Sequence, residues 1–166
     1  MTSFIGVYDK VLSSGDCGFV VNEFGVSSGE LINQRFSEAA LNSHYIKSAV
    51  YESMNKYVAK FMPFVESMHH FNVDDEYTFQ KYEKGAQSKL WQCEHTPLAS
   101  HRILAWQIFL NDAVGMEFLN YRNVRGRIGR VLIWPAGWTH RHRSAPNNKG
   151  DKYVANGGVS FQHRTG

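Results

Sequence analysis

The spacing of apolar side chains predicts a long helix in the first half of the chain. From about Ser43 onward, apolar residues recur at intervals of three and four, which places them on one buried face of a helix. Because proline lacks a backbone N–H and disfavours helix in the residue before it, Pro63 should end this helix near Met62. The apolar face comprises Val50, Met54, Tyr57, Phe61, Phe64 and Met68.

Two shorter elements are predicted before this helix. Residues 4–12 have the pattern of an edge strand. Residues 13–24 favour a short helix with Ser13 or Ser14 as N-cap, because a hydroxyl there can accept a hydrogen bond from a free backbone N–H. Residues 25–42 begin with a Ser- and Gly-rich stretch and show no clear period, so no element is assigned to them.

After His70 the pattern changes to short runs of β-branched and aromatic residues bounded by Gly, Pro, Asn and Asp, which is typical of strands. Helices followed by strands indicate an α+β domain, in which an antiparallel sheet or a closed double sheet carries the helices on one side. Without internal repeats or low-complexity segments, residues 1–166 are predicted to form a single domain. The strand-like runs are residues 76–85, 102–112, 129–137 and 152–163.

Composition and charge narrow the class of protein. The hydrophobic content of 43% and aromatic content of 14% indicate a folded protein. Its two cysteines, Cys17 and Cys93, are too few for a disulfide framework and suit a reducing compartment. The N-terminus lacks the features of a signal peptide, and no apolar run approaches the roughly 20 residues that span a bilayer. We therefore expect a cytoplasmic protein with no membrane partner.

The formal charge of +3 is mild, but arginines are locally dense in the second half of the chain. Such a cluster either holds an anionic ligand or solvates a surface hairpin. No aromatic stacking motif accompanies it, so we favour the solvated surface and expect no nucleic-acid partner. The cluster comprises Arg122, Arg125, Arg127, Arg130, Arg141 and Arg143.

The segment "WQCEH", residues 91–95, is a candidate metal-binding strand. On a strand, Gln92 and Glu94 would project to one face, and Cys93 and His95 to the other. A non-haem Fe(II) oxygenase site needs two imidazoles and one carboxylate on one face of the metal. A carboxylate is present here, and the later segment "WPAGWTHRHRSAP" supplies histidines, but the second imidazole is missing from its expected place.

Longer motifs surround this segment. Tyr82, Gly85, Gln92 and Glu94 keep the spacing of a tyrosine, a glycine and a His-x-Glu pair. Then follow "FLND", "GMEF", "GRVLIWPAGWTHRHRSAP" and "GDKY" in the same order. In these residues the chain resembles the small single-domain, prolyl-4-hydroxylase-like members of the 2-oxoglutarate- and Fe(II)-dependent dioxygenases. The resemblance implies a double-stranded β-helix core, jelly-roll or cupin-like, with the N-terminal helices packed on one sheet.

The resemblance also implies roles for individual residues. Glu94 and His142 would bind Fe(II), with Gln92 in the place of the first histidine. Lys152, ten residues after His142, would pair with the far carboxylate of 2-oxoglutarate. Tyr82 would line the pocket near this cosubstrate.

The sequence departs from the family pattern in the same pocket. Gln92 replaces an imidazole by a weaker amide donor. Phe109 stands where many members have a tyrosine that helps to hold the far carboxylate. Gly158 stands where the family often has tryptophan, and Asn156 replaces a threonine. Among the other histidines, His140 is the best substitute ligand, because on a strand it would share a face with His142.

Three functions stay open. The first is an oxygenase that uses dioxygen and couples decarboxylation of 2-oxoglutarate to hydroxylation of an unknown protein, peptide or small molecule. The second is a catalytically silent module that uses the oxygenase fold for binding or regulation. The third is a cupin-like enzyme with a different metal or no 2-oxoglutarate.

Substrate selection is expected from residues 27–42 and 115–130, because loops at the mouth of such a barrel usually determine which substrate binds. Four other histidines, His44, His69, His70 and His163, are expected at the surface or at helix ends.

Overall fold

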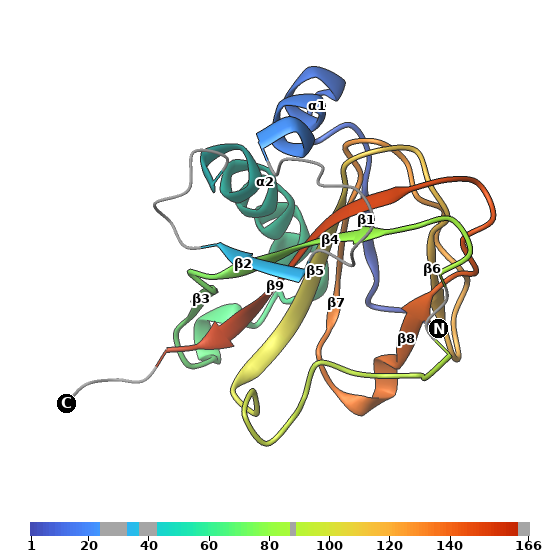
Figure 1. Ribbon diagram of the computed structural model, residues 1–166. Coiled ribbons are helices and arrows are strands. Elements are labelled where there is room, and N and C mark those ends of the chain that lie inside the picture. Colours follow the sequence, from blue (N-terminus) through green and yellow to red (C-terminus); the bar gives the residue numbers. More distant parts are fainter. Residues whose placement is uncertain (24–32, 37–42, 87–88, 163–166) are drawn as a thin grey trace.

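The computed structural model describes residues 1–23, 33–36, 43–86 and 89–162 (Figure 1). Its α-helices are α1 (Ser14–Glu23) and α2 (Ser43–Phe61), and its 3-10 turns are η1 (Val65–Ser67) and η2 (Trp138–His140). The strands are β1 (Gly6–Tyr8), β2 (Asn33–Phe36), β3 (Phe71–Val73), β4 (Tyr77–Tyr82), β5 (Arg102–Phe109), β6 (Met116–Phe118), β7 (Val131–Pro135), β8 (His142–Ser144) and β9 (Lys152–Phe161).

The strands form one large and one small antiparallel sheet. The large sheet has the order β1-β7-β5-β9-β4-β2, with β3 paired to β9 beyond this path. The small sheet consists of β6 and β8. Strand β1 lies at an edge, and all four strand-like runs contain a strand, as the sequence pattern predicts. The predicted α+β class is confirmed.

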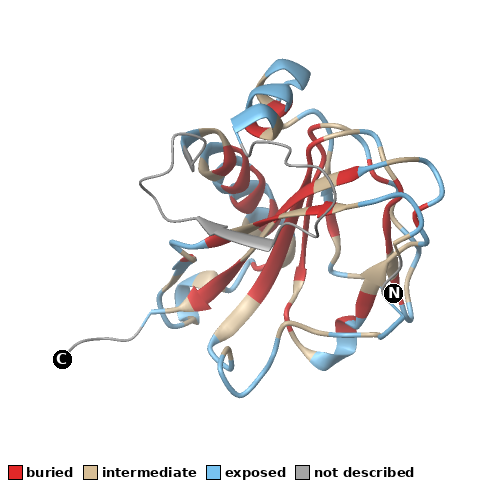
Figure 2. Cartoon of the chain, viewed as in Figure 1, coloured by how far each residue is buried: buried red, intermediate tan, exposed pale blue. Residues whose placement is uncertain are grey.

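Both helices lie on one side of the large sheet, and the small sheet lies on the other (Figure 1). Buried residues follow the inner side of α2 and the central strands (Figure 2). The helix ends at Phe61, just before Pro63, as expected. However, Phe64 lies beyond this end and is 60% exposed, so its assignment to the buried face was wrong. The first of two hydrophobic cores lies between the helices and the large sheet. The residues of α2 that pack in it are Ile46, Ala49, Val50, Met54 and Tyr57.

The N-cap of α1 is Ser13. Its Oγ accepts a hydrogen bond from the backbone N–H of Asp16 at 3.1 Å and donates one to the Asp16 carboxylate at 2.8 Å. This reciprocal arrangement satisfies one of the N–H groups that every helix leaves free at its start. In the helix that follows, Cys17 and Val20 are buried in the first core.

A second core lies between the large and the small sheet. Side chains alternate along a strand. Strands β5, β7 and β9 therefore point one set of side chains into the first core, below the helices, and the other set into this inner core. The inner core holds Ala105, Phe109, Met116, Phe118, Leu132, Trp134 and Val154. The described residues contain no helix long and apolar enough to cross a bilayer.

Two sequence predictions fall partly or wholly outside the described residues. Within residues 27–42, the structure describes only strand β2. His163 lies beyond the last described residue.

Candidate functional site

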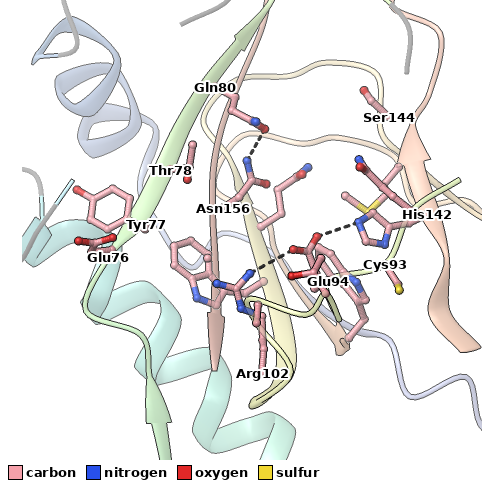
Figure 3. Close-up of a pocket in the computed structure, with 18 of the residues that line it drawn as sticks. Glu76, Tyr77, Thr78, Gln80, Cys93, Glu94, Arg102, His142, Ser144 and Asn156 are labelled. Carbon is pink, nitrogen blue, oxygen red and sulfur yellow. Dashed lines mark hydrogen bonds and ion pairs between the residues drawn. The ribbon is translucent and has the colours of Figure 1, made fainter. Parts of the chain in front are cut away.

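A cavity of about 680 Å³ opens between the inner face of the large sheet and the segment that leads into β5 (Figure 3). Strands β4, β5, β8 and β9 and residues 92–102 contribute to its wall. Six charged or polar residues that bear on its chemistry line it together: Tyr82, Gln92, Glu94, Arg102, His142 and Lys152. The structure therefore brings together side chains that are up to 70 positions apart in the sequence.

Residues 91–95 do not form the predicted strand. Only Gln92 pairs, in an isolated antiparallel bridge with His142. The N–H of each residue donates to the carbonyl of the other, at 3.0 and 2.9 Å. Residues paired in this way project their side chains to the same face, so Gln92 accompanies His142 toward the cavity. Cys93 also contributes to the lining of the cavity, and its Sγ lies 3.7 Å from the backbone carbonyl oxygen of His95.

Glu94 and His142 lie within direct reach of each other. Their closest atoms, Glu94 Oε1 and His142 Nε2, are 3.3 Å apart. The Nδ1 atom of His142 lies 3.1 Å from the backbone carbonyl oxygen of His140, which can only accept, so Nδ1 carries a hydrogen. In the neutral ring Nε2 would then present a lone pair to the carboxylate. A cation between the two atoms, either a proton or a metal ion, removes this repulsion.

Aromatic rings fix the orientation of the His142 imidazole. The ring of Trp134 stands edge-on to it, with ring centroids 5.0 Å apart, and that of Phe118 lies at 6.0 Å. His142 is 4% exposed and is thus held in the wall of the cavity.

Arg102 binds the other oxygen of Glu94, an interaction that the sequence analysis missed. Its Nη1 lies 3.2 Å from Glu94 Oε2, and its Nη2 lies 3.2 Å from Asp74 Oδ2. Burial by itself would raise the pKa of Glu94, but hydrogen bonding and charge from His142 and Arg102 outweigh it and lower this pKa. Glu94 is therefore an anion between two basic groups.

A β-bulge directs Arg102 toward the cavity. In the pairing of β5 with β9, Arg102 lies opposite Ser160 and Leu104 opposite Val159, so Ile103 is the extra residue. One extra residue reverses the faces on its two sides. Arg102 thereby joins the inner face, whereas Leu104 keeps its place in the core below the helices. No pattern in the sequence marks this position.

Lys152 is a buried cation at another wall of the cavity. Its Nζ donates to Ser144 Oγ at 3.0 Å and to the backbone carbonyl of Gly115 at 3.2 Å. The ring centroids of Tyr82 and Phe109 lie 5.5 and 5.3 Å from Nζ. Burial lowers the pKa of Lys152 to about 8. Within the described residues Lys152 has no carboxylate partner.

The two aromatic residues predicted beside the cosubstrate differ in position. Tyr82 lines the cavity, and its hydroxyl donates to Gln80 Oε1 at 2.8 Å. The same oxygen accepts from Asn156 Nδ2 at 2.8 Å, so β4 and β9 present a connected polar wall. Phe109 is fully buried and does not line the cavity. Its ring contacts the Lys152 side chain, and its place beside the cosubstrate stays a prediction.

His140 is not placed to replace the missing ligand. It ends the 3-10 turn η2, not a strand, and its Nε2 lies 2.7 Å from the backbone carbonyl oxygen of Ser3. Its Nδ1 lies 2.9 Å from Thr139 Oγ1, and its ring stacks on that of Tyr121 at 4.7 Å. Both nitrogens are thus engaged away from the cavity. This geometry does not support His140 as the substitute ligand.

The arginine cluster is largely solvated. Arg122, Arg125, Arg127 and Arg141 are exposed. Arg130 pairs with Asp9 at 2.6 Å, and Arg143 pairs with Glu117 at 2.6 Å.

The donor set fits a divalent cation through two strong ligands and one weak one. Within the described residues, no group of three or more His, Cys, Asp and Glu side chains could hold a metal ion. Glu94 and His142 nevertheless offer an oxygen and a nitrogen that face each other, and the amide of Gln92 lies on the same wall. An amide oxygen is a weaker ligand for Fe(II) than imidazole.

The other walls of the cavity suit a ligand that accepts hydrogen bonds. Gln107 Nε2 and Trp134 Nε1 are buried donors without a partner within the described part of the chain, and both residues line the cavity. Buried donors normally have partners, so such atoms call for an explanation. The buried ammonium group of Lys152 at the same cavity fits an anionic, oxygen-rich molecule such as a 2-oxo dicarboxylate.

No protein-family model matches the sequence, and no curated protein does. Solved structures do match. The viral collagen prolyl hydroxylase of Paramecium bursaria Chlorella virus-1, in a 2-oxoglutarate complex, superposes with a TM-score of 0.69 at 12% identity, over 96% of this chain and 97% of that chain. A prolyl-4-hydroxylase of Pseudomonas putida gives 0.69 at 13% identity, over 98% and 95%.

The chain has the fold of the prolyl-4-hydroxylase-like oxygenases. A third example is a prolyl hydroxylase of Trichoplax adhaerens, in complex with a peptide of the hypoxia inducible factor oxygen degradation domain. It superposes with a TM-score of 0.71 at 12% identity, over 96% of this chain and 84% of that chain. The double-stranded β-helix inferred from the sequence motifs is thereby confirmed.

Proposed function

We propose that the chain is a 2-oxoglutarate- and Fe(II)-dependent oxygenase with an atypical metal site, which uses dioxygen to hydroxylate a protein, peptide or small molecule. The observation that carries this proposal is Lys152. A buried ammonium group without a carboxylate partner among the described residues lines the same cavity as Glu94 and His142. A buried charge of this kind is costly unless an anion accompanies it.

Each residue has a defined part in this proposal. Glu94 and His142 would hold Fe(II), and the side-chain oxygen of Gln92 would be the third protein ligand. Bound iron supplies two functions, chelation of the 2-oxo acid and activation of dioxygen. Lys152 would pair with the far carboxylate of 2-oxoglutarate, because a charge-assisted hydrogen bond is strongest where water is excluded. Tyr82 would line the pocket near this cosubstrate.

The alternative, a catalytically silent binding module, has one observation in its favour. Arg102 already neutralises Glu94, the carboxylate that a metal ion would need. The two proposals differ in whether metal and 2-oxoglutarate bind together.

The test is anaerobic addition of Fe(II) and 2-oxoglutarate to the wild type, Gln92→His and His142→Ala, with the metal-to-ligand charge-transfer absorption as readout. We expect a band in the wild type, a stronger band in Gln92→His at the same iron concentration, and none in His142→Ala. Succinate formation in air would then establish turnover. A band in Gln92→His alone would support the silent module. No band in the wild type and none in Gln92→His would refute the cosubstrate role of Lys152.

A further inference from the structure

Arg102 lies between two carboxylates and contacts both. Its Nη1 binds Glu94 and its Nη2 binds Asp74, each at 3.2 Å. Its side chain is only 25% exposed, and those of Glu94 and Asp74 are 31% and 21% exposed. Ion pairs at this depth are screened by solvent much less than surface pairs. The guanidinium group of Arg102 is thus a permanent positive charge beside the Glu94 carboxylate.

Strand β9 leaves room for the Arg102 side chain because its residue at that point, Gly158, has no side chain. A Cβ atom at Gly158 would overlap Nε, Cδ and Cζ of Arg102. Arg102 Nε is buried without a hydrogen-bond partner within the described residues, which indicates that packing on Gly158, not full hydrogen bonding, holds this part of the side chain. Glycine at 158 and arginine at 102 therefore form one structural unit.

This unit bears directly on metal binding. Glu94 has two oxygens, one facing His142 Nε2 and the other bound to Arg102. A divalent cation beside Glu94 and His142 would meet a fixed positive charge on the opposite oxygen of the same carboxylate. Arginine stays protonated at all ordinary pH values, so this charge does not titrate away.

We propose that Arg102 is a positioning residue that competes with the metal ion for Glu94 and so sets the metal affinity of the site; this inference rests on the proposed function. In the metal-free protein Arg102 keeps the buried carboxylate paired. When metal binds, the guanidinium group gives up part of its hold on Glu94 and retains its second partner, Asp74. Arg102 thus makes the site weak for metal but stable when empty.

The experiment measures Mn(II) binding by the electron paramagnetic resonance signal of free Mn(II), at pH 7 and with 2-oxoglutarate present. The variants are Arg102→Gln, which removes the charge, and Gly158→Ala, which displaces the side chain but retains its charge. The matched control is Arg130→Gln, which removes an arginine–carboxylate pair outside the cavity. His142→Ala is the control for binding at the site itself.

We expect Arg102→Gln to bind Mn(II) at least about tenfold more tightly than the wild type, with Arg130→Gln unchanged. Gly158→Ala should also bind more tightly, and it serves as the test if Arg102→Gln does not fold. Equal or weaker binding by Arg102→Gln would overturn the inference.

The outcomes separate this inference from the proposed function. If Arg102→Gln binds Mn(II) as the wild type does and His142→Ala loses binding, the role of Arg102 is overturned. The proposed metal site is then still supported. Binding in Arg102→Gln with none in the wild type would support the role of Arg102 and refute oxygenase activity in the wild type. No binding in either protein would overturn both.

Discussion

The side chain of Arg102 fills the space above Gly158 where any other residue would place its Cβ atom. The neighbouring glycine has a similar relationship with another residue, because a Cβ at Gly157 would overlap the ring of Trp106. The two contacts differ in kind. Arg102 is long and partly exposed, whereas Trp106 is rigid and 2% exposed in the core below the helices.

This difference predicts unequal losses of stability for the same substitution. Gly157→Ala should destabilise the protein by about 1–3 kcal/mol or more, because neither the indole ring nor the strand can give way. Gly158→Ala should cost less, because the arginine side chain can move aside. Thermal unfolding of both variants measures the difference. Equal losses would show that Arg102 is held as rigidly as Trp106.

Replacement of Lys152 by methionine should weaken 2-oxoglutarate binding and at the same time raise the stability of the free protein. Lys152→Met removes the cation proposed to hold 2-oxoglutarate, and loss of one partner of a buried charge pair costs about 2–5 kcal/mol, at least roughly 30-fold in affinity. The same change removes a buried charge, so we expect the melting temperature of the free protein to rise by about 2–4 °C. Calorimetric titration and thermal unfolding test the two effects. Unchanged 2-oxoglutarate affinity would contradict the assignment.

Binding of 2-oxoglutarate should depend on pH through Lys152. Burial lowers the pKa of this group from 10.5 to about 8. The ammonium form that pairs with a carboxylate is therefore half populated at about pH 8 and nearly complete about one pH unit lower, and affinity should fall above pH 8 by up to about tenfold per pH unit. Titrations from pH 6.5 to 9.5 measure this profile. Affinity that stays constant to pH 9.5 would contradict it.

The same pKa has a consequence for stability. Between pH 8 and 10.5 the unfolded chain holds the Lys152 proton and the folded chain has released it, so the contribution of this group to stability rises with pH. The stability difference between Lys152→Met and the wild type should accordingly shrink across this range. Chemical unfolding at pH 7.5 and 10 compares the two proteins, and a difference that grows with pH would have the wrong sign.

Replacement of His140 should lower the stability of the fold and leave the metal affinity nearly unchanged. His140→Leu removes the contacts of the ring with Ser3, Thr139 and Tyr121, for which we expect a loss of about 1–2 kcal/mol. The backbone carbonyl that accepts from His142 Nδ1 remains. Mn(II) affinity should therefore stay within about twofold of the wild-type value. A larger loss of affinity would return His140 to the ligand set.

Long periodic elements and the motif residues could be predicted from the sequence, because local patterns determine them. The apolar period located α2, Pro63 located its end, and the residues carried over from the family motif, Glu94, His142 and Lys152, line one cavity. The conformation of residues 91–95 could not be predicted. Only Gln92 of that segment forms a β-bridge, and the backbone of the segment is held by His142 and Ala136, which lie far along the chain.

Sequence alone determined the α+β class, the positions of both helices and of strands β1, β4, β5, β7 and β9, and the residue types available for chemistry. These follow from periodicity and from the order of motifs along the chain. Only the tertiary structure decided the electrostatic state of Glu94. That state depends on a bulge at Ile103, on the absence of a Cβ at Gly158 and on the approach of Asp74 from another strand connection. Such contacts join distant segments and obey no sequence period, so Arg102 became visible as part of the site only after folding.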